Sequence, residues 1–412
     1  MNVAAPSSLL LLLQLLLLAS LAAASTSTRS TVGPSVVNIS NVQLRHDVRG
    51  EAMDIHDGSI ITHTDPTTGE VEYLYYGMGY QNCTIQHSWF PPHWCPGIYQ
   101  PFGQCGFRTD HAVRLYASKD LANWTLRSSN VFPVATRPYG IYFRAKVVFC
   151  CRTGLYVLWL NYLPNASSPL AAYPTAELLV ATSSTVDGPF AFESIVTGLA
   201  HAGAGDFTLM VHTAPSNEAQ GGTDDVAYVA YGSWSTEHSL AIELLNENFT
   251  NSLGLRNTSG IITPPGNEAP ILFERQGWFY LLFGECCCFC QQGAATRALV
   301  SSSPLGPWQP LGSCANATAP VDLNPLQQDG HRIIPSQNDY VFRIPRNSSS
   351  SAADGDSYVW MGDRWASALD GIFGHTLQSW HALHFHRAVD SPADAPPCIE
   401  ALTWQDWFLL SV

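Results

Sequence analysis

An aromatic and β-branched segment recurs five times in the chain, and this recurrence constrains the fold more than any other feature. Such segments favour buried β-strands, because branched and aromatic side chains pack well on a pleated sheet. The five copies lie at residues 73–77, 155–159, 226–231, 278–283 and 358–361. A second strand-like segment follows four of them, at residues 115–118, 179–182, 240–245 and 299–302, and residues 382–385 form a weaker fifth copy.

A repeated unit of about 50–80 residues, with four short strands and almost no helical periodicity, is typical of a β-propeller. The sequence therefore predicts an all-β fold, a five-bladed β-propeller of four-stranded antiparallel blades. A pair of β-sandwiches is the competing architecture. The propeller is preferred because the repeats run from about residue 50 to 410 without the change of composition that marks a linker. We expect residues 402–407 to complete the first blade and close the ring.

The N-terminal end has the pattern of a secretory signal peptide at residues 1–24. It has an uncharged start, a leucine-rich run from Leu9 to Leu21, and small residues before Ser25. The start lacks the usual lysine or arginine, so an uncleaved membrane anchor is the alternative. Residues 25–45 are predicted to be a loose, Ser/Thr-rich segment, and residues 46–412 to be the propeller domain. No later stretch approaches the roughly 20 apolar residues of a membrane span, so no membrane contact is expected after cleavage.

Glycosylation motifs and cysteines agree with a secreted, extracellular protein. The eight Asn-x-Ser/Thr sequences start at Asn38, Asn82, Asn123, Asn165, Asn248, Asn257, Asn316 and Asn347. The eleven cysteines are expected mainly as disulfides. Cys150 and Cys151 are candidate partners for the cluster at residues 286–290. Neighbouring cysteines point to opposite faces of an extended chain, so this cluster is not predicted to bind a metal.

Charge limits the partners that the chain can bind. A net charge of −14 argues against nucleic acid and against an anionic membrane surface. It is compatible with a neutral polysaccharide or oligosaccharide. The oligomeric state is left open.

Glu268 is the strongest candidate for a catalytic acid. It enters a segment in which two apolar runs flank residues 274–277, and this pattern predicts a β-hairpin with a short glycine-containing turn. Asp57, ahead of the first aromatic strand, and Asp206, after Gly205, have similar positions at strand entries. Strand entries on different blades converge at one end of a propeller channel, so we expect the three carboxylates to open onto one central cavity.

The residues resemble those of glycoside hydrolase family 43, a family of five-bladed propeller glycosidases. The resemblance covers nearly the whole mature chain. It implies that Asp57 is the general base and Glu268 the general acid. Asp206 matches the aspartate that orients the acid and tunes its pKa.

Further motifs look like the branch of this family that contains exo-β-1,3-galactanases. They are Ala269-Pro270 and the segments at residues 303–308 and 362–365. In that branch a late glutamine has a base-like role, and Gln337 is similar to it. The branch commonly has Glu-Arg-Pro-Lys where this chain has residues 143–146, Phe-Arg-Ala-Lys, and an acidic hairpin where this chain has a long loop at residues 212–225.

Hydrolysis of a glycosidic bond needs one carboxyl group that protonates the leaving oxygen and one ionised group that activates water. Asp206 is expected to raise the pKa of Glu268 by like-charge repulsion. The resemblance implies a secreted O-glycosyl hydrolase that acts on galactan or arabinogalactan by inversion and needs no cofactor. The alternatives are an arabinofuranosidase, xylosidase or galactosidase of the same fold, and a carbohydrate-binding propeller without catalysis.

Other residues are candidates for contact with the sugar. Arg144 and His56 are predicted to bind substrate, and Trp365 is predicted to stack on a sugar ring. His56 and His375 are also candidates to hold a structural cation in the central channel. No metal-dependent catalytic site is predicted.

Overall fold

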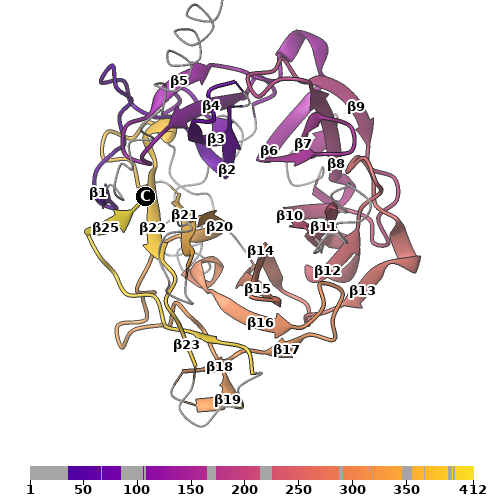
Figure 1. The fold of residues 1–412 in the computed structure, drawn as a ribbon, viewed down its shortest axis with the longest axis vertical. Coiled ribbons are helices and arrows are strands. Elements are labelled where there is room, and N and C mark those ends of the chain that lie inside the picture. The colour runs from indigo at the N-terminus through magenta and orange to yellow at the C-terminus, as the bar shows by residue number, and fades with distance from the viewer. Residues whose placement is uncertain are drawn as a thin grey trace, which may run out of the picture. The chain divides into compact units, whose positions relative to one another are not determined.

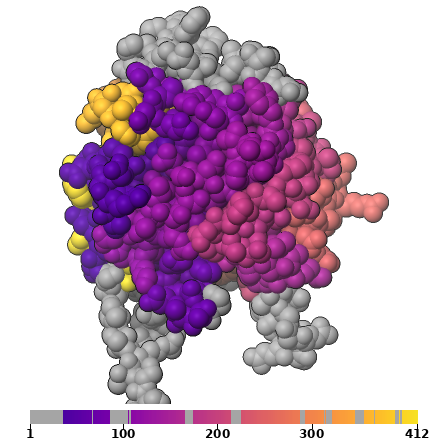
Figure 2. Space-filling view, turned by 90° about the horizontal axis from the view of Figure 1, so that it is seen from above, coloured from indigo at the N-terminus to yellow at the C-terminus, as the bar shows by residue number. Residues whose placement is uncertain are grey.

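Five antiparallel sheets lie around a common centre, which confirms the predicted five-bladed propeller (Figure 1). This computed structural model describes residues 36–65, 67–84, 105, 108–164, 173–213, 225–286, 291–314, 316–345, 355–365, 367–387, 392 and 395–412. The innermost strands are β2 (His56–Thr64), β6 (Gly140–Cys150), β10 (Ala204–Thr213), β14 (Asn267–Arg275) and β20 (Gln337–Ile344). Successive blades follow one another across the face seen in the space-filling view (Figure 2).

The second strand of each blade contains one of the five recurring aromatic segments. These strands are β3 (Val71–Gly79), β7 (Leu155–Pro164), β11 (Asp225–Ser233), β15 (Trp278–Glu285) and β21 (Ser357–Arg364). The third strands are β4 (Ala112–Ser118), β8 (Glu177–Ser183), β12 (Ser239–Leu244), β16 (Arg297–Ser301) and β22 (Leu377–Ala382). The outer strands of the first four blades are β5 (Thr125–Ser128), β9 (Ala191–Ile195), β13 (Thr258–Ile261) and β17 (Gln309–Pro310).

The two ends of the described chain meet beside the fifth blade. There, β1 (Val36–Ser40) pairs with β25 (Trp407–Ser411) in a two-stranded sheet. The expectation that the C-terminal tail completes the first blade is therefore wrong, because its strand partner is β1. The Asn41 side chain joins this pair to β22: its amide donates to the Trp380 carbonyl (3.0 Å), and its oxygen accepts from the Trp380 N–H (2.8 Å).

The hydrophobic core is divided into five clusters, and each cluster fills the space between two neighbouring blades. Leu74 and Leu115 of the first blade pack with Leu158 and Leu179 of the second. One of the five clusters lies between the fifth blade and the first, and it includes Phe408 of β25. Full burial of each such side chain stabilises the fold by about 1.5–3 kcal/mol. The aromatic repeats therefore act mainly between blades.

The predicted hairpin around the candidate acid forms as expected. Strands β14 and β15 pair up to Arg275 and Trp278, which leaves Gln276 and Gly277 as a two-residue turn. Both turn residues have positive φ, 54° and 79°, as a type I′ turn requires. The turn lies at the far end of the hairpin from Glu268.

The remaining elements are short. Two pairs of strands lie outside the blades: β18 (Gly312–Ser313) with β19 (Asn316–Pro320), and β23 (Phe385–His386) with β24 (Cys398–Ile399). The 3-10 helices are η1 (Val134–Thr136), η2 (Tyr173–Thr175), η3 (Trp234–Thr236), η4 (Gly254–Arg256), η5 (Gln291–Ala294) and η6 (Phe373–His375). Within the described ranges, no helix has the length and apolar character that crossing a bilayer requires.

Candidate active site

Each of the five innermost strands carries a β-bulge near its N-terminal end. An extra residue at a bulge interrupts the hydrogen-bond ladder and re-aims the neighbouring side chains. The interruptions lie between His56 and Ser59, Phe143 and Lys146, Ala204 and Phe207, Glu268 and Ile271, and Asn338 and Tyr340. The predicted site residues at or beside these bulges are His56, Asp57, Arg144, Asp206, Glu268 and Gln337.

Asp57 is held in an unusual backbone conformation by buried carboxylates. Its φ is 52°, in the left-handed region that non-glycine residues seldom adopt. The Asp57 N–H donates to Asp363 Oδ2 (3.0 Å), and the Gly58 N–H donates to Asp339 Oδ2 (3.0 Å). Gly58 is required here, because a Cβ at this position would lie 2.1 Å from the Tyr76 carbonyl oxygen. The bulge on β2 is thus fixed by charged side chains from the fifth blade.

Arg144 connects two of the candidate catalytic carboxylates. Its guanidinium forms a bidentate ion pair with Asp206, with Nε 2.7 Å from Oδ1 and Nη2 2.8 Å from Oδ2. The same Nε lies 4.0 Å from Asp57 Oδ1. Burial lowers the pKa of Arg144, but Asp206, Asp57 and Asp339 outweigh burial and raise it. Arg144 therefore stays charged and joins the first, second and third blades.

The amide of Gln337 connects Asp206 to Glu268. Its Nε2 donates to Asp206 Oδ2 (3.1 Å) and to Glu268 Oε1 (3.0 Å). Its Oε1 accepts from the Trp365 indole N–H (2.8 Å). An indole nitrogen can only donate, so this contact requires the amide oxygen to face Trp365 and the NH2 group to face the carboxylates. Trp365 thereby fixes the orientation of the amide.

Asp57 lies deeper than Asp206. It is 4% exposed, and its Oδ2 accepts a hydrogen bond from the Tyr80 hydroxyl (3.1 Å). Burial raises the pKa of Asp57, Arg144 opposes this, and the neighbouring carboxylates Asp363, Asp339 and Asp206 add to it, which brings the pKa to about 7. Asp57 is therefore a carboxyl group that gains or loses its proton near neutral pH.

A buried ion pair lies beneath this carboxylate. Lys146 Nζ is 2.6 Å from Asp339 Oδ1 and also donates to the Gly58 carbonyl. Burial raises the pKa of Asp339 to about 6 although Lys146 opposes the shift, and burial lowers the pKa of Lys146. Burial thus disfavours the charged form of both partners, and their contacts with each other and with the Gly58 carbonyl support the backbone at Asp57.

His56 lies under the site instead of lining an open surface. Its ring is fully buried, with Nε2 3.3 Å from the Gly374 carbonyl and Nδ1 3.4 Å from Asp363 Oδ1. Burial lowers the pKa of His56, but Asp363 and Asp54 outweigh burial and raise it. The Nδ1 of His375 is paired with Asp370 at 2.6 Å.

Two clusters have the residue types of a metal site. Asp57, Asp339 and Asp363 place oxygen atoms within 4.8 Å of one another, but Arg144 and Lys146 supply positive charge there. In the second cluster His238, Glu268 and Cys286 also come within 4.8 Å, but Cys286 is disulfide-bonded and offers no thiolate. Cationic side chains thus already neutralise part of the first cluster, and the second keeps two of its three possible ligands.

The structure brings six of the predicted residues into one connected network: Asp57, Arg144, Asp206, Glu268, Gln337 and Trp365. The seventh, His56, joins it through Asp363. Trp365 stacks on Phe373, with ring centroids 5.8 Å apart, so one face of the indole is covered by protein. Phe143, where the related branch has a glutamate, lies edge-on to His111 (6.5 Å). Most of the altered loop at residues 212–225 lies outside the described residues.

Sequence reasoning missed several residues that support the network. They are Asp54, Tyr80, Lys146, Asp339 and Asp363. One signal was present for Lys146, Asp339 and Asp363, since each is a charged residue directly beside an apolar strand segment. Charged residues are seldom fully buried unless they are paired, so charges in such positions indicate a buried network.

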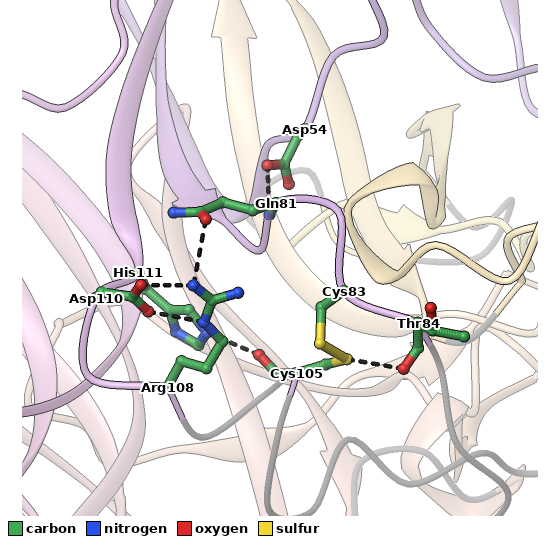
Figure 3. The surroundings of a disulfide bond; sticks show 8 residues. All are labelled: Asp54, Gln81, Cys83, Thr84, Cys105, Arg108, Asp110 and His111. Carbon is green, nitrogen blue, oxygen red and sulfur yellow. Dashed lines mark hydrogen bonds and ion pairs between the residues drawn. A yellow bond between two sulfur atoms is a disulfide. The ribbon is translucent and has the colours of Figure 1, made fainter.

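A disulfide lies beside this network (Figure 3). Cys83–Cys105 closes the chain around residues 85–104, which lie outside the described residues. Arg108 binds Asp110 and the Gln81 side chain, and the Gln81 N–H donates to Asp54 (2.8 Å). Asp54 also accepts from the N–H of Tyr80 (2.8 Å), the residue that bonds Asp57.

A second disulfide joins Cys314 to Cys398. Cys150 keeps a buried thiol, so its predicted disulfide with the cluster at residues 286–290 is wrong. The Cys150 thiol lies 3.5 Å from the Glu247 carbonyl instead.

Comparison with known proteins identifies the fold. No protein-family model and no curated protein sequence matches the chain. Among solved structures, a family 43 β-1,3-galactosidase superposes with a TM-score of 0.61 at 20% identity, over 91% of this chain and 64% of that chain. An exo-β-1,3-galactanase from Clostridium thermocellum gives 0.63 at 21% identity, over 90% and 66%. One from Phanerochaete chrysosporium, with β-1,3-galactotriose, gives 0.59 at 19% identity, over 90% and 68%.

The family named for these structural neighbours is the one that the sequence motifs resemble. At about one-fifth identity, the similarity establishes the propeller fold. The chain spans about two thirds of the length of these three proteins.

Proposed function

We propose that this protein is an inverting glycoside hydrolase that releases galactose units from β-1,3-linked galactan. The observation that carries the proposal is the Gln337 amide, which holds Asp206 and Glu268 together while Arg144 joins Asp206 to Asp57. Carboxylates from three blades thus belong to one network. The galactan class is supported by the names of the structural neighbours, which are galactosidases and galactanases.

Glu268 is the proposed general acid. It begins the bulge on β14 and is 8% exposed, so its carboxyl group is mostly shielded from bulk water. In this role it donates its proton to the leaving oxygen. The Gln337 amide, which also binds Asp206, positions the acid.

Asp57 is the proposed general base, and Gln337 is assigned a positioning role. The Gln337 oxygen already accepts from Trp365, and its NH2 group holds two carboxylates, so neither end is free to take a proton from water. Asp57, with its pKa near 7, is ionised on the alkaline side of neutrality. Inversion requires the base and the acid to lie roughly 6.5–9.5 Å apart across the sugar.

Arg144 and His56 act as supporting residues in this proposal. Both side chains are buried, and their polar atoms face protein carboxylates and carbonyl groups. Direct recognition of the sugar therefore falls to the more exposed side chains around Asp206. Secretion is also proposed, on the basis of the apolar segment at residues 1–24, which lies outside the described residues.

A substrate panel tests the proposal. We expect the wild-type protein to release galactose from β-1,3-galactobiose and β-1,3-galactan, and NMR of the fresh product to show the inverted anomer. Arabinofuranosides and xylosides are the matched alternative substrates. Release only from these would overturn the galactan assignment, and binding without release from any substrate would overturn the enzyme assignment.

Two variants test the assignment of the base. Asp57→Asn is expected to abolish most hydrolysis, whereas Gln337→Ala retains a measurable fraction with a disturbed pH profile. The opposite result, with Gln337→Ala inactive and Asp57→Asn active, would transfer the role of base to Gln337. A retained anomeric configuration would contradict inversion whichever residue is the base.

A further inference from the structure

The connection between β11 and β12 places an aromatic pair beside the candidate acid. The pair consists of Trp234 in η3 and His238 just before β12, with ring centroids 4.2 Å apart in an edge-to-face arrangement. A nitrogen of His238 lies within 4.8 Å of a Glu268 carboxylate oxygen. A Cβ on Gly205, the residue before Asp206, would lie 3.7 Å from the Trp234 indole nitrogen. The pair therefore flanks two of the three candidate catalytic carboxylates.

Backbone hydrogen bonds fix this connection between the two strands that carry those carboxylates. The Trp234 N–H donates to the Gly203 carbonyl (2.8 Å), just before β10. The Asn267 N–H, next to Glu268, donates to the His238 carbonyl (2.8 Å). The position of the pair is thus tied to the positions of Asp206 and Glu268.

The backbone of this connection is unusual as well. Glu237 and His238 both have positive φ, 53° and 64°. Non-glycine residues seldom adopt this conformation, and those that do cluster at binding and catalytic sites. The conformation turns the His238 ring toward Trp234 and Glu268, where both rings remain partly exposed.

Solvent reaches the network from this same side. The Asp206 side chain is 24% exposed, whereas the side chains of Asp57 and Arg144 are 6% and 2% exposed. A substrate that enters from solvent therefore meets Asp206, Trp234 and His238 first. Burial lowers the pKa of His238, although Asp206 opposes the shift, and this favours the neutral ring, which can both donate and accept hydrogen bonds.

We propose that Trp234 and His238 form the binding site for the departing sugar, the unit on the acid's side of the bond that is cleaved. This inference rests on the proposed glycosidase function. In a reaction that proceeds from Glu268 on one side to Asp57 on the other, the groups next to the acid contact the leaving group. Trp234 presents an indole surface to the C–H face of the sugar, and His238 hydrogen-bonds to one of its hydroxyl groups.

Two substrates that differ only in the leaving group test the site. β-1,3-Galactobiose has a sugar leaving group, and β-galactosyl fluoride has none that could fill the proposed site. We expect Trp234→Ala to lower kcat/KM for galactobiose by about tenfold and to change the fluoride rate by less than about twofold. His238→Ala is expected to lower kcat/KM for galactobiose by about threefold. Trp234→Phe, which keeps an aromatic ring, is expected to have a smaller effect.

Trp407→Ala is the matched control, because Trp407 lies on β25 and is 43% exposed. It should change neither rate. Equal losses on both substrates in Trp234→Ala and Trp234→Phe would overturn the inference and leave the proposed function intact.

If the wild-type protein hydrolyses neither substrate, the proposed function fails, and calorimetry decides the inference. Tighter binding of galactobiose than of galactose, lost in Trp234→Ala, would then support the sugar site, and no such preference would overturn it.

Discussion

The candidate active site has a buried side and an open side, and they meet at Arg144. On the buried side, the side chains of Asp57, Asp339, Asp363 and Lys146 are all 1–6% exposed. On the open side, Asp206 is 24% exposed, and the rings of Trp234 and His238 are partly exposed. The buried side belongs mainly to the first and fifth blades, and the open side to the third.

The difference separates two tasks that a hydrolase has to perform. The buried carboxylates of Asp339 and Asp363 accept hydrogen bonds from backbone N–H groups, and Asp339 also pairs with the Lys146 ammonium group. These contacts hold the bulge that carries Asp57. The more exposed carboxylate of Asp206 is held by side-chain amide and guanidinium groups instead. Substitutions of the supporting charges Asp339, Asp363 and Lys146 are therefore expected to act first on stability, and those on the open side first on activity.

Glu268→Gln should have the largest effect and should fall on activity alone. General acid catalysis contributes about 10²–10⁴-fold, so hydrolysis of galactobiose is expected to drop by that factor. Aryl galactosides, whose leaving group needs little protonation, should be affected much less. Equal losses on both substrate types would show that Glu268 is not the proton donor, and an unchanged melting temperature serves as the control for folding.

Lys146→Met should have a large effect on the free energy of unfolding. Removal of one partner of a buried ion pair leaves the other charge uncompensated, at a cost of about 3–5 kcal/mol. Urea denaturation measures this loss. Lys119→Met is the matched control, since the Lys119–Glu70 pair is exposed and worth about 0–1 kcal/mol. Similar losses in both variants would contradict the description of a buried side.

Trp365→Phe tests whether Gln337 must be held in one orientation, and its effect on the rate should be intermediate. The variant keeps the ring stacked on Phe373 but removes the N–H that orients Gln337. A buried acceptor without its donor costs about 1–3 kcal/mol, so kcat/KM is expected to fall by about tenfold. Trp404→Phe loses an exposed hydrogen bond to Asp406 and should leave the rate unchanged. Unchanged kinetics in Trp365→Phe would show that the amide needs no fixed orientation.

The pH dependence of stability should give the smallest signal. The pKa of Asp57 is about 7 in the folded protein, above its ordinary value of 3.8, so the folded state holds this proton more tightly than the unfolded state. Its contribution to stability is therefore present at acid pH and is lost as the pH rises from about 4 to 7. Asp57→Asn should flatten the fall in melting temperature over that range. The exposed Asp187→Asn should not, and an unchanged slope in Asp57→Asn would contradict the pKa shift.

The fold was predictable because blades repeat. Side chains such as Tyr76, Trp159 and Trp360 recur at a regular interval, and their burial between blades explains the periodicity. The position of the C-terminal strand was not predictable, since its partner β1 lies in a segment whose composition gave no strand signal. The pairing depends on where the closed ring brings the two ends together.

The site was predictable only in part, for a physical reason. Asp57, Asp206 and Glu268 follow a motif at strand entries, and the structure connects them through Gln337 and Arg144. The supporting charges could not be paired from sequence, because Lys146 and Asp339 lie on different blades and are 193 positions apart in the chain. The burial of His56 depends on packing against Gly374, which no local pattern encodes.

The repeated bulge on the innermost strands has a consequence for protein engineering. The same irregularity occurs near the start of β2, β6, β10, β14 and β20, so six of the predicted site residues lie in five short segments of the chain. Most side chains of the clusters between blades lie outside these bulges. The residues at the five bulges could therefore be substituted together to introduce a new reaction, while the blades are kept as the scaffold.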